Sequence, residues 1–191
     1  MVIYMEDWVN KPQNVPVKPC RSLAIDIGMS NFAGCLMHDN VVIYCDKFAI
    51  GNNKQPINEL IDSMVNQFTI LSQIFIDVDN VKIEMQRGNI AIKNYAISAA
   101  VYAFYKSKNI DVRFENPTVK FKKLETLKQT GEIIELRQLD FKQKGKALKK
   151  LSIEAAAILA KHYNHTVFLE NASKTKKLDD LADCLLMAML P

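Results

Sequence analysis

Four acidic residues occupy positions from which they could bind metal ions together. Asp26 lies within the apolar run of residues 23–27, Glu84 ends a later apolar run, and Asp180 and Asp183 stand three residues apart near the C-terminus. Helical residues at that spacing share one face. Carboxylate oxygens suit Mg²⁺, and two such ions about 4 Å apart can activate a water and stabilise the leaving 3′ oxygen of a phosphodiester. We therefore predict that all four acids are catalytic metal ligands for two Mg²⁺ ions, with Mn²⁺ able to substitute.

Each acid also has a simpler explanation when it is taken alone. An Asp at a strand end often caps the following turn, and Glu84 could face solvent on an edge strand. Asp179 and Asp180, in the first turn of a helix, would complement the helix dipole, although this accounts less well for Asp183. The order of the acids along the chain is that of a two-metal site: first strand, later strand, final helix. We therefore favour one shared site over four separate accidents.

The spacing of apolar residues predicts the elements that would carry these acids. Three short strands joined by tight turns are expected at residues 22–28, 32–38 and 41–50, as in an antiparallel meander. Helices are expected at residues 57–75, 90–106, 147–162 and 178–190, with further strands at 81–85 and 110–114. Strands that alternate with helices pair in parallel. The expected fold class is α/β, with a mixed five-stranded sheet flanked by helices.

Two segments give weaker signals. Residues 120–143 are expected to form a mobile basic region or short helical pieces, and residues 167–169 a short strand or a connector. Residues 1–21 contain three prolines and little apolar periodicity, so they are expected to form an extended arm outside a domain of residues 22–191.

Composition narrows the classes of protein to consider. A chain of 191 residues, with 49% hydrophobic and 24% charged residues, has the balance of one ordinary soluble domain. It contains no apolar run near the roughly 20 residues that cross a bilayer, so we expect an intracellular protein with no membrane contact. The four cysteines are far apart and lack zinc spacing, so we expect them to be reduced: Cys20, Cys35, Cys45 and Cys184.

Positive charge is concentrated in one segment. Residues 118–150 contain 10 Lys and Arg against 4 Asp and Glu, whereas the whole chain has a net charge of only +4. Such a block favours a polyanion, because neutralising phosphates releases their condensed counterions. A solvated lysine-rich surface would have the same composition. The charge pattern alone leaves both interpretations open.

Four sequence stretches together resemble the RuvC-like Holliday junction resolvases, especially the poxvirus and mitochondrial types of this RNase H-like superfamily. They are SLAIDIGMSNF at residues 22–32, VKIEMQ at 81–86, GKALKKLSIEA at 145–155 and KLDDLADCLL at 177–186. The resemblance implies an RNase H-like fold in which the four acids are the metal ligands. It also implies that Lys150 is the active-site lysine that contacts the scissile phosphate, with Lys146 and Lys149 as competitors. The basic insert at about 118–145 has no counterpart in this pattern.

The same resemblance implies a substrate and an assembly. Members of the family are dimers that cut four-way DNA junctions by paired symmetric nicks, which leaves ligatable 5′-phosphate ends. DNA-binding roles are expected for seven residues: Asn31, Gln86, Lys120, Lys122, Lys123, Lys146 and Lys149. The helix at residues 89–106 is a candidate dimer face through Tyr95, Tyr102, Phe104 and Tyr105, unless those aromatic side chains belong to the core. The expected location is a viral factory in the host cytoplasm or a mitochondrion.

Two other functions compete with this hypothesis. The sequence DIGMSN at residues 26–31 also resembles a phosphate-binding hairpin of actin-like and sugar-kinase ATPases. Such proteins need a second lobe and further glycine-rich loops, whereas this chain has only 6 glycines, so we expect no nucleotide cofactor. The other alternative is a DNA-binding module that retains the fold without catalysis, which the presence of all four acids disfavours.

Overall fold

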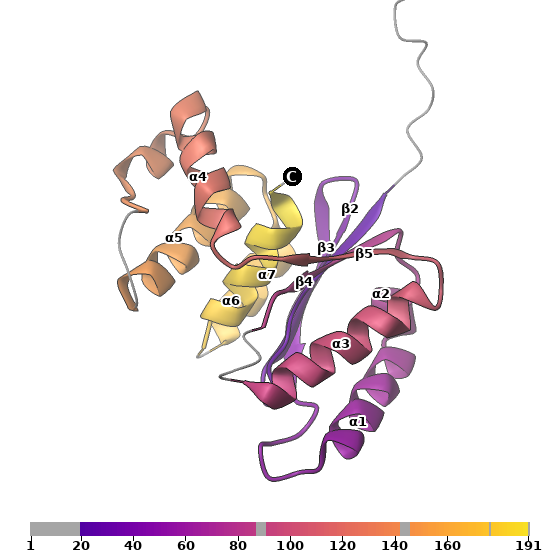
Figure 1. Ribbon diagram of the computed structural model, residues 1–191. Helices are drawn as coiled ribbons and strands as arrows, with labels where there is room; N and C mark the ends of the chain where they lie inside the picture. The colour runs from indigo at the N-terminus through magenta and orange to yellow at the C-terminus, as the bar shows by residue number, and fades with distance from the viewer. Residues whose placement is uncertain (1–19, 87–90, 142–145, 176, 191) are drawn as a thin grey trace, which may run out of the picture.

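The computed structural model describes residues 20–86, 91–141, 146–175 and 177–190 (Figure 1). Its sheet has the strand order β3-β2-β1-β4-β5. The strands are β1 (Arg21–Asp26), β2 (Phe32–His38), β3 (Val41–Phe48), β4 (Asn80–Glu84) and β5 (Asp111–Glu115). The first three pair antiparallel, and β4 pairs in parallel with β1 and β5. The mixed sheet predicted from the sequence is therefore confirmed.

Helices cover both faces of this sheet (Figure 1). On one face lie α1 (Ile57–Ile70), α2 (Ser72–Phe75) and α3 (Ile92–Lys106). The elements on the other side are α4 (Val119–Thr130), a 3₁₀ helix (Ile134–Gln138), α5 (Lys146–His162), α6 (Thr166–Lys174) and α7 (Asp179–Met189). Side chains alternate between the faces of a strand, so Leu23 and Ile25 belong to the first core and Ala24 to the second.

Small buried residues allow α7 to lie directly against the sheet. Ala24 on β1 and Ala33 on β2 are fully buried in the same core as Ala182 of α7. The end of α7 is held from β4, because the buried Lys82 donates hydrogen bonds to the carbonyl oxygens of Met187 (2.9 Å) and Leu190 (2.8 Å). These carbonyls have no partner within the helix, and a cation at this end also complements the helix dipole. Strand β4 thus anchors the helix that carries two of the predicted ligands.

Several sequence expectations differ from the structure. The helix expected at residues 57–75 is interrupted at Leu71, whose backbone leaves the helical region at φ −99° and ψ 38°. Residues 167–169 form neither a strand nor a connector, because they lie inside α6. Arg21, assigned to the arm, begins β1, and residues 1–19 of that arm lie outside the described residues. Residue 90, the expected start of the following helix, also lies outside them.

The basic segment contains short helices, the second of the two alternatives. Leu124 of α4 and Leu136 of the 3₁₀ helix are fully buried, and Ile133 is almost so. These side chains join the core that also contains α5 and α7. The segment is therefore a packed part of the domain, although residues 142–145 of it lie outside the described residues.

The state of the cysteines and the lengths of the helices bear on two further expectations. All four cysteines are free thiols, three of them buried and Cys20 exposed, as expected. No helix within the described ranges is long and apolar enough to cross a membrane.

Candidate active site

The sheet register brings Asp26 and Glu84 to the same edge. Strands β1 and β4 are parallel neighbours in which Ile25 is paired with Ile83. The residues that follow them, Asp26 and Glu84, therefore lie side by side at the carboxyl ends of the two strands. Ligand chemistry gathers at this edge in sheets with parallel strands. Asp180 and Asp183 approach it from the first turns of α7.

The four carboxylates lie close enough to perturb one another. Burial raises the pKa of Asp26 well above its ordinary value, and Glu84, Asp183 and Asp180 raise it further. A hydrogen bond between the carboxyl groups of Asp26 and Glu84 acts in the same direction. A buried carboxyl group surrounded by like charge resists ionisation unless a cation approaches. The structure therefore assembles a cluster of negative potential from three separate elements.

Lys120 lies inside this cluster. Its ammonium nitrogen is 2.7 Å from Asp183 Oδ1 and 3.4 Å from Glu84 Oε1, and its side chain is only 5% exposed. Burial alone would lower the pKa of Lys120, but Asp183, Glu84 and Asp26 raise it above its ordinary value, so the side chain stays charged. The sequence alone predicts only a DNA-binding role for Lys120. The first turn of α4 instead places it between the carboxylates of β4 and α7.

Asp180 retains an oxygen without a hydrogen bond. Its Oδ2 atom is buried and accepts no hydrogen bond from the described residues, although Lys177 Nζ lies 3.2 Å away as an ion pair. Burial raises the pKa of Asp180 in spite of the opposing charge of Lys177. Buried carboxylate oxygens usually accept a hydrogen bond, so this oxygen has acceptor capacity left beyond its ion pair with Lys177.

Two polar side chains orient the acids. The hydroxyl of Ser152, buried on α5, donates a hydrogen bond to Asp183 Oδ1 at 2.5 Å. The amide of Gln86 donates to Asp26 Oδ1 at a longer 3.4 Å. Sequence reasoning did not identify Ser152 as a site residue. The available signal for a site residue was the hydroxyl of Ser152 on the face of this helix that is otherwise apolar, because a buried polar group requires a partner.

Replacing Ser152 with alanine should weaken catalysis more than folding. Groups that hydrogen-bond to metal ligands typically contribute about 10–100-fold to metal affinity or activity, because they fix the orientation of the ligand. We expect a loss of that size in the cleavage rate at limiting Mg²⁺, with partial recovery at high Mg²⁺. Ser107→Ala, which removes an exposed hydroxyl at the end of α3, is the matched control. An unchanged Mg²⁺ dependence in Ser152→Ala would contradict this role.

The lysines of α5 lie farther from the acids than the resemblance implied. Lys146 and Lys150 are exposed, and among the described residues no hydrogen bond or ion pair joins Lys150 to the four carboxylates. Lys149 pairs with Asp179 at 2.8 Å rather than with a predicted ligand. The role of Lys150 at the scissile phosphate therefore stays a prediction, and Lys120 is the lysine that the structure places among the acids.

The other predicted DNA-binding residues have different surroundings. Lys122 is exposed on α4. Lys123 is partly buried, 3.3 Å from Glu115, and also donates to the carbonyl of Leu190. Asn31 is half-buried, and its backbone N–H donates to the carbonyl of Gly28 in the turn that follows β1. Contacts to DNA by these residues stay predictions.

The donor chemistry of the cluster suits a divalent cation. Its four carboxylates include an Asp180 oxygen that accepts no hydrogen bond from the described residues and a carboxyl group on Asp26 whose pKa is raised by burial and by the neighbouring acids. Hard oxygen donors of this kind are those that Mg²⁺ prefers. In the described part of the chain, however, no three acidic, histidine or cysteine side chains are placed to hold one ion together. Lys120 bridges Glu84 and Asp183 in this structure.

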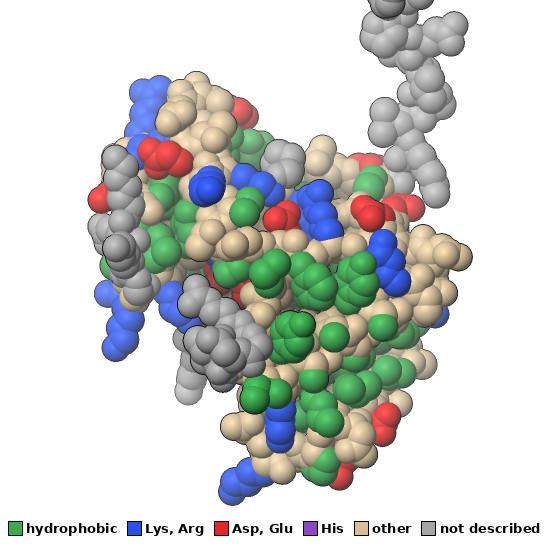
Figure 2. All heavy atoms as spheres, in the orientation of Figure 1, with side chains coloured by type: hydrophobic (Ala, Val, Ile, Leu, Met, Phe, Trp, Pro, Cys, Tyr) green, Lys and Arg blue, Asp and Glu red, His purple; other side chains and the backbone are tan. Residues whose placement is uncertain are grey.

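An apolar groove lies on the side of the sheet that α3 covers. Its cavity of about 350 Å³ is lined by Met85, Gln86, Tyr95, Ser98, Ala99, Tyr102 and Phe114. Figure 2 shows hydrophobic side chains gathered over α3 and the neighbouring strand. Tyr95 is 54% exposed, whereas Tyr105 is fully buried and donates a hydrogen bond to the carbonyl of Phe75. Of the four predicted aromatic residues, Tyr95 and Tyr102 therefore line this surface, and Tyr105 belongs to the core.

Comparisons by sequence gave no match. No protein-family model matches the chain. A search of curated proteins likewise found no match.

Comparisons by structure gave consistent neighbours. The yeast mitochondrial Holliday junction resolvase Ydc2 has a TM-score of 0.64 at 15% identity, over 92% of this chain and 81% of that one. The Fowlpox virus resolvase, solved with Holliday junction DNA, has a TM-score of 0.58 at 18% identity, over 88% and 94%. Thermus thermophilus RuvC with a Holliday junction substrate has a TM-score of 0.58 at 13% identity, over 90% and 91%. The chain thus shares its fold with these resolvases, and the RNase H-like fold predicted from its sequence is confirmed.

Proposed function

We propose that this protein is a divalent-metal-dependent endodeoxyribonuclease that resolves four-way DNA junctions by paired symmetric nicks. The observation that carries the proposal is the convergence of Asp26, Glu84, Asp180 and Asp183 at one edge of the sheet, where burial and the other three acids raise the pKa of Asp26. The fold shared with structures of Holliday junction resolvases supports the choice of substrate. An intracellular site of action, in a viral factory or a mitochondrion, stays a prediction.

Asp26, Glu84, Asp180 and Asp183 would hold two Mg²⁺ ions, with Mn²⁺ able to substitute. Bound ions would supply an activated water and stabilise the leaving 3′ oxygen. Ser152 holds the carboxylate of Asp183 in orientation, and β4 keeps Glu84 beside Asp26. Rigid supports of this kind matter because misplacing a reacting group by about 1 Å can cost about 10²-fold in rate.

Lys120 would act on the phosphate. Its ammonium group now neutralises Glu84 and Asp183 and stays charged, so a positive group is already at the place where DNA must approach. A fixed cation beside the scissile phosphate stabilises the negative charge that develops in the transition state. Lys149 and Lys122, both exposed, would contribute to binding through the DNA backbone.

Paired symmetric nicks require two active sites related by a two-fold axis. The groove lined by Met85, Tyr95, Tyr102 and Phe114 is the apolar surface from which we propose that the homodimer forms. Ile92, 73% exposed at the start of α3, extends the apolar character of this surface. Contiguous exposed apolar side chains of this kind mark interaction sites.

Charged side chains placed on this surface should prevent dimerisation, so that the two strands of a junction are no longer cut as a pair. We expect the double variant Ile92→Glu with Tyr95→Glu to be monomeric, because dimerisation would desolvate two unpaired carboxylates from each protomer. Analytical ultracentrifugation measures the mass, and a cruciform plasmid distinguishes single nicks from paired cuts. Ile70→Glu is the matched control, because Ile70 is 72% exposed on α1. A double variant that stays dimeric would place the interface elsewhere.

The two alternatives from the sequence are less well supported. The described residues contain one five-stranded sheet, and the structural neighbours reported above are Holliday junction resolvases. A non-catalytic DNA-binding module would have no need for a crowded acidic cluster, since these carboxylates repel the phosphates that such a module must bind. The cluster therefore favours catalysis.

The deciding experiment is a cleavage assay on synthetic DNA. We expect the purified protein to cut a four-way junction in the presence of Mg²⁺ or Mn²⁺, to leave linear duplex of the same sequence largely uncut, and to be inactive with EDTA. Products that religate without processing would demonstrate symmetric cuts. Binding of junction DNA without any cleavage under these conditions would favour the non-catalytic alternative, and ATP binding would favour the ATPase.

A further inference from the structure

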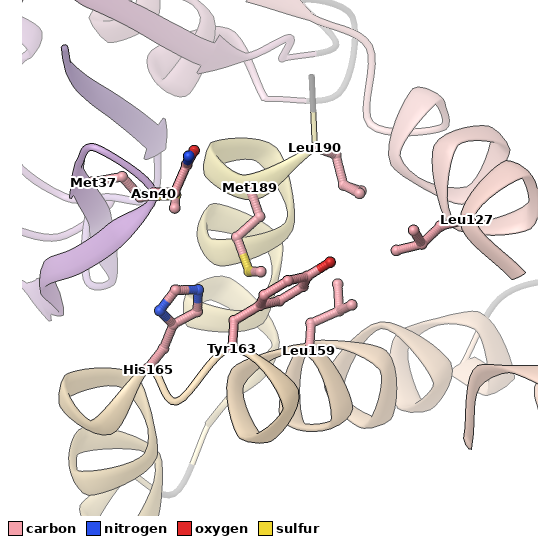
Figure 3. Close-up of a pocket in the computed structure, with 8 residues that line it drawn as sticks. All are labelled: Met37, Asn40, Leu127, Leu159, Tyr163, His165, Met189 and Leu190. Carbon is pink, nitrogen blue, oxygen red and sulfur yellow. The ribbon is translucent and has the colours of Figure 1, made fainter. Parts of the chain in front are cut away.

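A second cavity lies at the opposite end of α7 from the acids. It has a volume of about 460 Å³ and is lined by Met37, Asn40, Leu127, Leu159, Tyr163, His165, Met189 and Leu190. In Figure 3 the side chains of Leu127 (α4), Leu159 (α5), Tyr163 (which follows α5) and Met189 (α7) face a common space, and His165, just before α6, lies at its edge. Asp180 and Leu190 are ten residues apart, so the cavity is about 15 Å along the helix from the candidate active site.

The cavity combines an apolar wall with one unsatisfied polar group. His165 is only 3% exposed, and its Nε2 atom has no hydrogen-bond partner among the described residues. Burial lowers the pKa of His165, so the ring is neutral near pH 7 and one of its nitrogens can accept a hydrogen bond. Buried polar atoms without a partner are uncommon. An occupant with an apolar body and one polar hydrogen would satisfy both features.

The chain enters the described structure beside this cavity. The backbone N–H of Cys20 donates to Asp39 Oδ1 at 2.9 Å, and the carbonyl of Cys20 accepts from the N–H of Asp39 at 3.2 Å. Asp39 adjoins Asn40, which lines the cavity. Residues 1–19 are therefore attached next to the cavity, and residues 10–19 alone can span up to about 33 Å.

The arm has a composition that suits the cavity. Its first nine residues are MVIYMEDWV, which contain the chain's single tryptophan, Trp8, and six other apolar or aromatic side chains. Exposed together, these side chains would form an apolar patch of the kind that soluble proteins bury. Tryptophan has a large apolar ring, which suits the apolar cavity wall, and one N–H donor, which suits the acceptor nitrogen of His165.

We propose that the N-terminal arm docks into this cavity of its own chain, with Trp8 buried against Leu127, Leu159 and Met189. In the docked arrangement the indole N–H donates to His165 Nε2. The attachment at Cys20 makes binding intramolecular, at an effective concentration that short tethers raise to about the millimolar range. The docked arm joins the β2–β3 turn to the end of α7, and so stabilises the helix that carries Asp180 and Asp183. The inference does not depend on the proposed nuclease function.

Because Trp8 is the single tryptophan of the chain, its fluorescence reports directly on docking. In the full-length protein we expect a blue-shifted emission maximum and protection from acrylamide quenching. Leu127→Glu, which places a charge in the cavity wall, should shift the emission to that of the urea-unfolded protein and remove the protection. Ile70→Glu, exposed on α1 far from the cavity, should leave both unchanged. Circular dichroism verifies that both variants remain folded.

A second variant covers the case in which Leu127→Glu does not fold. Trp8→Ala leaves the cavity wall intact, so its empty apolar cavity should bind the dye 1-anilinonaphthalene-8-sulfonate more than wild type does. Solvent-exposed Trp8 emission in the wild type, or burial of Trp8 that Leu127→Glu does not disturb, would overturn the proposal. Trp8 burial that disappears on dilution would also overturn it, because it would indicate docking into a second copy of the chain.

Discussion

Replacing Asp26 with asparagine should abolish junction cleavage while leaving junction binding intact. Asp26 lies at the centre of the acidic cluster, and asparagine keeps its shape but removes the negative charge that a divalent cation requires. We expect the cleavage rate to fall by at least roughly 10²–10³-fold, the effect of losing one preorganised electrostatic group. Binding should be equal or slightly tighter, since one charge that repels phosphate is removed. Single-turnover cleavage and gel-shift assays on one synthetic junction measure both quantities.

The same variant should be at least as stable as the wild type without metal. Burial and the neighbouring acids raise the pKa of Asp26, so the native state holds a proton that the unfolded chain releases at lower pH. The free energy of unfolding of the wild type should therefore fall as the pH rises from about 4 through the raised pKa. Asp26→Asn removes this contribution, so its stability should depend less steeply on pH. Urea unfolding at pH 4 to 8 with EDTA tests the expectation.

If Asp26→Asn lost cleavage and was also unfolded, the loss of a metal ligand would not explain the result, because the defect would then be structural. Cleavage at the wild-type rate would exclude Asp26 from the mechanism. Asp62→Asn on α1 is a suitable control, since it makes the same chemical change outside the site and should leave cleavage and unfolding unaltered.

Replacing Lys120 with methionine should destabilise the protein in the absence of metal. Methionine keeps most of the apolar stem but leaves Glu84 and Asp183 without the cation that now bridges them. Removing one member of a buried ion pair typically costs about 3–5 kcal/mol, because the remaining charge is desolvated and unpaired. We expect a decrease of that size in the free energy of unfolding, measured by urea denaturation with EDTA. Lys122→Met, an exposed position on the same helix, should change it little.

Magnesium should reverse part of this loss. A divalent cation bound by the acids supplies the positive charge that the variant lacks, so added Mg²⁺ should stabilise Lys120→Met more than wild type. Cleavage should remain roughly 10²-fold slower even at saturating Mg²⁺, because the phosphate loses its fixed cation. Lys150→Met tests the competing assignment. If Lys150→Met loses more cleavage than Lys120→Met, Lys150 is the residue that contacts the phosphate.

An Mg²⁺ response that is the same in wild type and Lys120→Met would show that Lys120 and the metal do not share ligands. The bridge between Glu84 and Asp183 would then be a structural contact only. Isothermal titration calorimetry of Mg²⁺ into the two proteins gives an independent measurement.

The sequence by itself was sufficient to predict where acids would converge. Asp26 and Glu84 each end an apolar run, and two such runs in adjacent parallel strands bring their last residues to the same edge. The helical spacing of Asp180 and Asp183 was likewise local information. Strand periodicity and helix periodicity follow from the covalent chain, so the mixed sheet could be predicted without knowledge of distant contacts.

Only the tertiary structure decided which side chains surround those acids. Lys120 and Lys150 look alike in a lysine-rich segment, yet α4 places Lys120 within 2.7 Å of Asp183 while Lys150 is exposed on α5. Ser152 is one hydroxyl among many until α5 packs against α7. Local sequence determines the spacing at which apolar residues recur in a helix or strand. Which neighbours a given side chain meets depends instead on how separate helices pack. That packing is decided by burial of the shared core, in which residues far apart in the chain take part together.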